Sequence, residues 1–159
     1  MTSNNLERLI KLADEVFAVR NDPEQLNVNS AVIERLMKIH PSSISEYNDG
    51  NGPVAWVLLI PTTHDLMQRF LKKELSEKEL FDLTPTGIKY DALYLCSALV
   101  LEEYRRKGIT KQLILTAIEN IRKDHHLKSL FVWPFTKEGD LTANAIARLT
   151  SLPLYKRLK

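Results

Sequence analysis

Cysteine is almost absent from this sequence, because its 159 residues include only Cys96. A single cysteine excludes an intrachain disulfide and a CxxC metal site. Since Cys96 falls inside an apolar segment, we interpret it as a buried structural thiol rather than a nucleophile. No apolar run is long enough to span a bilayer, and residues 1–15 lack the charged start and apolar stretch of a signal peptide. We therefore expect a cytoplasmic protein with no membrane partner.

Glycine is scarce too, and its five positions (50, 52, 87, 108 and 139) match neither GxGxxG nor GxxxxGK[ST]. This spacing excludes the Rossmann and P-loop phosphate sites. The chain also lacks a large excess of charge, and its net charge of +2 does not by itself imply a nucleic acid or an anionic surface. A nucleic-acid binder is our weakest hypothesis, because no RNA-binding signature is present.

What is present is the composition of a folded soluble protein, with 44% hydrophobic and 26% charged residues. The length suits one domain, and no linker divides the chain. We predict a single α/β domain over residues 1–159, with N-terminal helices over about 5–39. Its core covers about 43–159 and includes a helical insertion over about 62–83.

The first half of the sequence predicts helices followed by a hairpin. Apolar residues at helical spacing indicate one helix from Leu6 to about Val19 and another from Ser30 to Ile39. Two alternating apolar segments around NDGNG predict antiparallel strands, the second of which we expect Pro61 to end. The remaining signals are Thr62 with Asp65, which resembles a helix start, and Ser76 with Glu79, which forms a capping box.

The stretch from Ala92 to Arg122 organises the rest of the chain. An apolar strand from Ala92 to Leu101 leads through a basic turn into a helix that begins at Ile109, and a strand from Leu130 to Trp133 follows. Strand, helix and strand in this order predict a parallel pair with a right-handed crossover. The last predicted helix begins at Gly139-Asp140 and buries Leu141, Ala145, Ile146 and Leu149. The sheet is therefore predicted to be mixed, antiparallel early and parallel late, with flanking helices.

The basic turn before the helix predicts an anion site. The first N–H groups of a helix have no internal partners, and the helix dipole favours negative charge there. A solvated basic turn is the alternative interpretation. Cations at a helix N-terminus oppose the dipole, however, and an anionic ligand would relieve that cost.

The turn reads Arg105-Arg106-Lys107-Gly108-Ile109-Thr110, which resembles the acetyl-CoA signature [Q/R]-x-x-G-x-[G/A] of the GNAT N-acetyltransferases. Arg105 matches the first position and Gly108 the central glycine. The order of strand, helix and FVW strand, and the closing LYKRL segment, are similar to that family as well. The resemblance covers about residues 90–158.

The resemblance implies a GNAT-like fold and transfer of an acetyl group from acetyl-CoA to an amine of a small molecule or a protein. A backbone N–H near Leu99 would polarise the thioester carbonyl, and the acceptor amine would attack the thioester directly. Coenzyme A would contact the strand end, where its pantetheine arm pairs, and the turn, where its pyrophosphate binds: Ala98, Leu99, Val100, Arg105, Arg106, Lys107, Gly108, Ile109 and Thr110.

Two residues are candidates for proton transfer. Glu103 lies beside the strand end and could accept a proton from the amine through water, or it could be an exposed carboxylate that balances Arg105 and Arg106. By resemblance, Tyr155 matches a tyrosine that protonates the leaving thiolate, although it could equally be a packing residue. We predict no metal site, because the histidines lack ligand-spaced partners, and we expect Trp133 in the core.

Three departures from the family pattern bear on function. Thr110 replaces a minimal side chain, helices are inserted before the central strand, and the family's last two strands would follow the final residue. Without those strands the acceptor pocket would be open, completed by a second subunit in a homodimer, or not catalytic. The alternative function is a non-catalytic GNAT-like domain that binds acyl-CoA or another protein. The sequence does not name the acceptor.

Overall fold

The computed structural model describes residues 8, 11, 12, 15, 30–134 and 136–158. Most of the helix predicted from Leu6 to Val19 lies outside the described residues, although residues 8, 11, 12 and 15 are helical. No helix in the described ranges is both long and apolar enough to cross a membrane.

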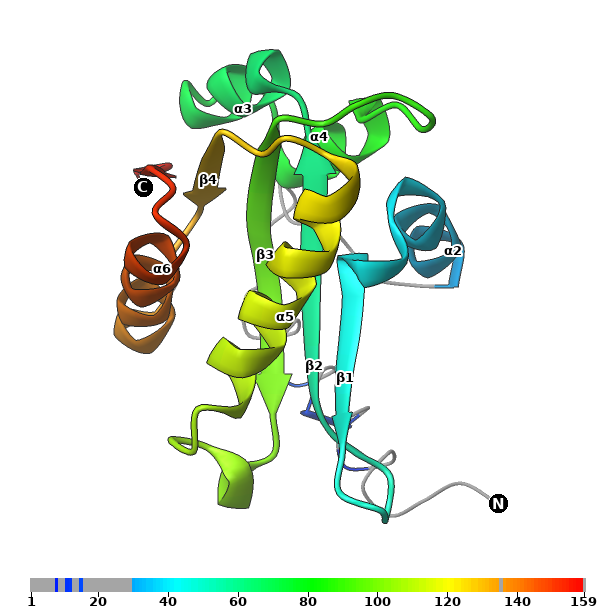
Figure 1. Cartoon of the computed structure of the whole chain (residues 1–159), viewed down its shortest axis with the longest axis vertical. Helices are drawn as coiled ribbons and strands as arrows, with labels where there is room; N and C mark the ends of the chain where they lie inside the picture. The colour runs from blue at the N-terminus through cyan, green and yellow to red at the C-terminus, as the bar shows by residue number, and fades with distance from the viewer. Residues whose placement is uncertain (1–7, 9–10, 13–14, 16–29, 135, 159) are drawn as a thin grey trace.

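One mixed sheet of five strands, in the order β1-β2-β3-β4-β5, forms the centre of the molecule (Figure 1). β2 pairs antiparallel with β1 and β3, whereas β4 pairs parallel with β3 and β5. This arrangement confirms the predicted mixed α/β fold, and β5 is a strand that the sequence did not predict. The strands are β1 (Ile44–Asn48), β2 (Pro53–Thr62), β3 (Ala92–Val100), β4 (Ser129–Val132) and β5 (Leu154–Lys156).

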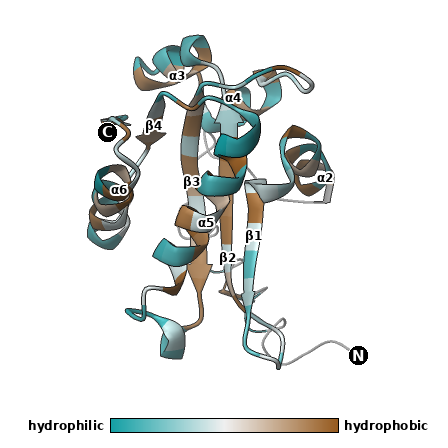
Figure 2. Ribbon diagram, in the orientation of Figure 1, coloured by the Kyte–Doolittle hydropathy of each residue, from teal (hydrophilic) through white to brown (hydrophobic). Residues whose placement is uncertain are grey.

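Helices cover both faces of the sheet, and the apolar strands lie between them (Figure 2). One face packs against the first three helices of the described chain, and the other packs against the last two. Figure 1 shows α5 crossing the central strands and α6 beside β4. The helices are α2 (Ser30–Ile39), α3 (His64–Leu71), α4 (Glu77–Leu83), α5 (Ile109–Asp124) and α6 (Lys137–Thr150), with short 3₁₀ turns η1 (Pro41–Ser43) and η2 (Glu102–Tyr104).

Three helix starts show how local chemistry sets the boundaries. The predicted capping box of α4 is present, because Glu79 N donates to Ser76 Oγ and Ser76 N donates to Glu79 Oε1, both at 3.1 Å. The cap of α3 is Thr63 and not Thr62, because Thr62 is still paired with β3. Thr136 caps α6, so that helix begins before the predicted Gly139.

Pro61 does not end β2, contrary to our prediction, because the strand continues through it to Thr62. β1 pairs with β2 only as far as Leu58, so the last residues of β2 have a strand on one side alone. Proline has no N–H to donate and is tolerated where a strand lies at an edge. The missing β1 partner therefore explains why Pro61 is compatible with β2.

A buried arginine holds the segment after β5 against the body of the molecule. Arg157 is 3% exposed, and its guanidinium carbon lies 4.5 Å from the ring centres of both Phe70 and Trp133. Its Nη1 donates to the carbonyl oxygen of Leu75 at 3.0 Å. Stacking of this kind is favourable when the cation is desolvated. Trp133, at the end of β4, is thereby fixed in place.

The two halves of β3 have different neighbours, and this difference creates the site described below. Within β3, only Ala92–Leu95 pair with β4. Immediately beyond Leu95 the register between β2 and β3 shifts by one residue, which leaves Cys96 as the extra residue of a β-bulge. A bulge bends a strand and increases its local twist. In the part of the chain that the structure describes, β3 therefore has β2 on one side and no strand on the other from residue 96 to residue 100.

Candidate functional site

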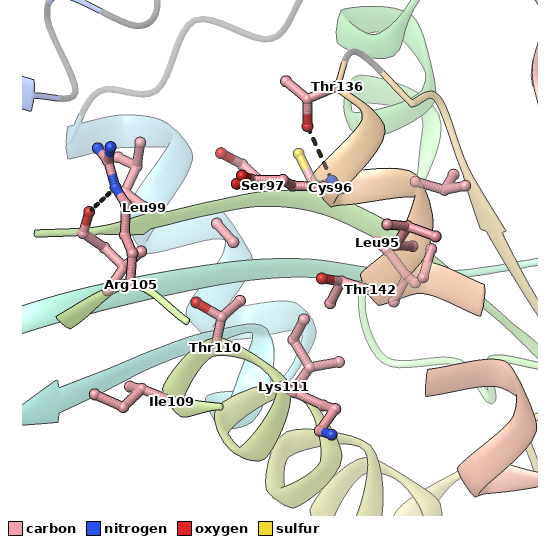
Figure 3. Close-up of a pocket in the computed structure, with 18 of the residues that line it drawn as sticks. Leu95, Cys96, Ser97, Leu99, Arg105, Ile109, Thr110, Lys111, Thr136 and Thr142 are labelled. Carbon is pink, nitrogen blue, oxygen red and sulfur yellow. Dashed lines mark hydrogen bonds between the residues drawn. The ribbon is translucent and has the colours of Figure 1, made fainter. Parts of the chain in front are cut away.

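A cavity of about 700 Å³ lies where β3 continues past the end of β4 (Figure 3). We call this space the wedge. Its lining comes from the second half of β3, the N-terminal turns of α5 and α6, and the residues that follow β4. Trp133, predicted as core, is 8% exposed and also lines the wedge.

The backbone of β3 offers hydrogen-bonding groups to the wedge. Leu101 N donates to Val54 O at 2.9 Å, so residue 101 points its backbone groups toward β2. Successive residues of a strand alternate in this direction. Ala98 and Val100 therefore turn their backbone groups toward the wedge, whereas the N–H of Leu99 itself faces β2. One of these groups is in use, because Arg105 Nε donates to Val100 O at 3.3 Å (Figure 3).

The N-terminus of α5 opens onto the same space. Gly108 precedes the helix with a φ of 76°, in the left-handed region that favours glycine, and no side chain caps the first turn. The first helical hydrogen bond runs from Gln112 N to Gly108 O, so the N–H groups of Ile109, Thr110 and Lys111 precede the ladder. These groups and the helix dipole form an anion-binding position.

Cationic side chains surround this position. Arg105, Arg106 and Lys111 line the wedge, and Arg106 is held at a φ of 63°, which is strained for a residue with a side chain. Glu138 of α6 also lines the wedge and lies 3.9 Å from Arg106. Both side chains are mostly exposed, and such surface pairs contribute little energy. The opening therefore has a predominantly positive lining.

The structure brings together eight of the nine residues predicted to contact coenzyme A. Lys107 is the exception, because its Nζ lies over the ring of Tyr104 at 5.4 Å from the ring centre. The eight that line the wedge are Ala98, Leu99, Val100, Arg105, Arg106, Gly108, Ile109 and Thr110.

Glu103 is engaged elsewhere. Its carboxylate accepts two hydrogen bonds of 2.6 Å from the guanidinium of Arg8, and this pairing lowers its pKa to about 2. So acidic a carboxylate is a weak base near neutral pH. Glu103 is also outside the residues that line the wedge. Its role as a general base stays a prediction without geometric support.

Tyr155 lies in β5, where it pairs with Phe131. Its side chain is 43% exposed and is not part of the lining of the wedge. The proposed role as a general acid likewise stays a prediction. Most residues predicted to contact coenzyme A thus line the wedge, whereas neither residue predicted to transfer a proton does.

Sequence reasoning missed the bulge and the contribution of α6. Cys96 is half-buried and lines the wedge, which corrects our interpretation of a buried thiol. Ser97 lines it too, and its Oγ is buried with no hydrogen-bond partner among the described residues. Thr136 caps α6 by accepting from Gly139 N at 2.9 Å at the margin of the wedge (Figure 3). The one feature of the sequence that marked this region was Pro134, which we expected to end the strand before it.

Comparison with protein families decides the identity of this fold. The model of the acetyltransferase (GNAT) family matches residues 7–149. The chain belongs to the GNAT acetyltransferase family. No curated protein and no solved structure gives a significant match.

Membership of the GNAT family confirms the family resemblance found in the sequence and agrees with the mixed sheet of the structure. GNAT proteins generally take acetyl-CoA as acyl donor and an amine as acceptor. Among the described residues, no group of three or more His, Cys, Asp or Glu side chains is placed to hold a metal ion.

Proposed function

We propose that this protein is an N-acetyltransferase that moves the acetyl group of acetyl-CoA to an amine in a single direct step. The observation that carries the proposal is the wedge, in which the half of β3 that extends beyond β4 meets the uncapped N-terminus of α5. An extended ligand with amide groups and an anionic end matches these two features.

The residues present fit coenzyme A. Its pyrophosphate suits the N–H groups at the start of α5, and Gly108 leaves that approach open because a Cβ built there meets no atom within 4 Å. Arg105 and Arg106 would neutralise the phosphate charge. The amides of the pantetheine arm suit the backbone groups of Ala98 and Val100, as an added strand would.

Acetyl-CoA supplies an activated acetyl group as a thioester. A backbone N–H of β3 that faces the wedge, on Ala98 or Val100, would donate a hydrogen bond to the carbonyl oxygen of the thioester. The apolar residues that line the wedge would exclude water and hold the acceptor amine against the carbonyl carbon. Arg105 would exchange its bond to Val100 O for the ligand's phosphates.

Calorimetric titration with acetyl-CoA tests the proposal. We expect saturable binding and a rise in the melting temperature, because a ligand that binds only the folded state stabilises it. Release of free thiol with an amine panel would then show transfer. Absence of any thermal shift at millimolar acetyl-CoA would refute both the enzyme and a simple acyl-CoA binder.

A matched pair of glycine substitutions locates the site. Gly108→Asp adds bulk and negative charge where the phosphates would bind, and we expect it to abolish binding. Gly87→Asp is the control, because Gly87 has the same φ of 76° and likewise has no atom within 4 Å of a built Cβ. Both variants carry the same backbone strain, so only a difference between their affinities reports the site. Equal affinities would show that coenzyme A binds elsewhere.

A second candidate is a non-catalytic GNAT domain that binds acyl-CoA or a protein partner. Thr110 favours it, because this side chain lines the wedge at a position where the family signature prefers glycine or alanine. Thr110→Ala separates the two candidates. If crowding limits the enzyme, the variant should bind acetyl-CoA more tightly and release thiol faster. A non-catalytic domain would show tighter binding with no thiol release.

A further inference from the structure

The bond between Arg8 and Glu103 joins two parts of the chain that are 95 residues apart. Arg8 Nη1 donates to Glu103 Oε2 and Nη2 donates to Oε1, each at 2.6 Å. Two parallel bonds of this kind fix the relative orientation of the two groups as well as their distance. The pair therefore determines where the helical residue Arg8 stands relative to η2.

η2 is the support of the basic turn. Tyr104 donates from its hydroxyl to the carboxylate of Asp49 in the β1–β2 turn, and Arg105 N donates to Glu102 O at 3.2 Å. Arg105 follows η2 directly and is the first residue of the turn that leads into α5. A change in the position of η2 therefore moves the residues that would receive the phosphates.

Arg8 and Leu12 are both helical and are four positions apart in the sequence, the spacing of residues that share one face of a helix. Leu12 packs in the small cluster of Val54, Leu99 and Leu101 and lines the wedge. Leu99 pairs with Trp56, on the face of the sheet opposite α5. The helical residues at positions 8 and 12 thus connect η2 to the wedge lining on the far side of β3.

We propose that the Arg8–Glu103 pair couples the two sides of the wedge, so that coenzyme A bound at the basic turn holds Leu12 in place on the far side of β3. The proposal rests on the proposed function. Arg8 and Glu103 are positioning residues, because neither lines the wedge. Such coupling is reciprocal, so a ligand that holds Leu12 in place would strengthen coenzyme A binding by the same factor. Since exposed ion pairs are weak, we expect a factor of about five at most.

Hydrogen exchange of residues 8–15 tests the coupling with coenzyme A alone, without a known acceptor. In the native chain, saturating coenzyme A should slow exchange in this segment. In Glu103→Gln, coenzyme A should still bind by calorimetry, but exchange in residues 8–15 should no longer slow. Glu102→Gln is the matched control, because Glu102 lies in the same turn whereas both hydrogen bonds of the Arg8 guanidinium described above go to Glu103, and it should behave as the native chain.

A charge exchange distinguishes coupling from a general structural defect. Arg8→Glu and Glu103→Arg should each lose the protection of residues 8–15, and the double variant should recover most of it. Equal protection in native chain and Glu103→Gln, at saturating coenzyme A, would overturn the coupling while leaving the proposed function intact. Failure of coenzyme A to bind the native chain would overturn the proposed function and the coupling with it.

Discussion

The two halves of β3 are one strand in the chain but two kinds of structure. Residues 92–95 pair with β2 and β4 and are fully buried, with relative exposures between 0% and 8%. Beyond the bulge at Cys96, residues 97–100 pair with β2 alone among the described strands and include the exposed Ala98. The first half is held by packing on both faces, whereas the second half offers backbone and small side chains to the wedge.

The difference teaches that adjacent residues of one strand have separate contacts, those of the first half with the core and those of the second half with the wedge. The bulge at Cys96 lies at the boundary, directly after the last residue that pairs with β4. A strand that kept β4 beside it along its whole length would have its backbone groups satisfied and nothing to offer a ligand. The early end of β4 is what makes the second half of β3 available.

The largest expected contrast comes from one substitution made in both halves. Ala92→Phe forces a ring into a core position that is 0% exposed, and overpacking of this kind costs about 1–3 kcal/mol or more of unfolding free energy. Ala98→Phe places the same ring in the wedge and should change stability by less than about 1 kcal/mol. Urea unfolding measures both.

Affinity should reverse that order. Ala98→Phe should weaken coenzyme A binding at least about tenfold, because the ring occupies the space beside the strand edge. Ala92→Phe, where it remains folded, should bind as the native chain does. The comparison between the halves would fail if Ala98→Phe were as unstable as Ala92→Phe.

Deletion of Cys96 sharpens the comparison by removing the boundary itself. The register on each side of the bulge is already regular, so the shortened strand can pair continuously with β2. We expect the stability to change by about 1 kcal/mol or less and coenzyme A affinity to fall several-fold, because the second half loses its bend. Calorimetric titration measures the affinity, and an unfolding curve of the same sample measures the stability. Native affinity in the deletion would show that the bulge does not shape the site.

Buried hydroxyl groups give a smaller contrast. Thr62 pairs with Ala92, and its Oγ1 lies 2.8 Å from Oγ1 of the equally buried Thr84. Thr62→Val leaves Thr84 with one partner fewer and should cost about 1–2 kcal/mol. Ser97→Ala removes a hydroxyl that bonds to no described residue, so it should be neutral within about 0.5 kcal/mol. Denaturation midpoints decide between these outcomes. A large loss of stability in Ser97→Ala would contradict the finding that the Ser97 hydroxyl bonds to no described residue.

The smallest expected effect is the change in folding stability at acid pH that comes from Glu103 in η2. Because Arg8 lowers the pKa of Glu103 from 4.5 to about 2, the folded state releases this proton more readily than the unfolded state. The stabilising contribution is therefore present above about pH 4.5 and is lost as the pH falls toward 2. Glu103→Gln should lose less stability than the native chain between about pH 5 and pH 3, as measured by melting temperature. Identical slopes would show that the pair contributes nothing.

The order of elements around β3 was predictable because each element shows its own spacing of apolar residues in the sequence. The apolar run of β3, the spaced apolar residues of α5 and the compact β4 specify strand, helix and strand locally, and the parallel pair then follows from handedness. The basic turn and Gly108 were likewise visible, because they are contiguous in the sequence and together are typical of an anion-binding helix start.

The bulge and the outer face of α6 could not be predicted, because they depend on distant neighbours. We expected Leu141, Ala145, Ile146 and Leu149 inside. Ile146 is buried as expected, whereas Leu141 and Leu149 are 57% and 55% exposed and Ala143 is buried in their place. α6 packs against α5 and β5, and β5 is too short to show a period of its own. The pairing of Glu103 with Arg8 is equally invisible in the sequence.

The shift of register at Cys96 also bears on how this protein can change over generations. Most substitutions are purged for their effect on stability rather than on activity. Because Ala98 is exposed to the wedge while the residues that pair with β4 are buried, side chains can vary in the second half of β3 while the fold keeps its margin. A single strand thus keeps a buried scaffold at one end and leaves the lining of the wedge open to variation at the other.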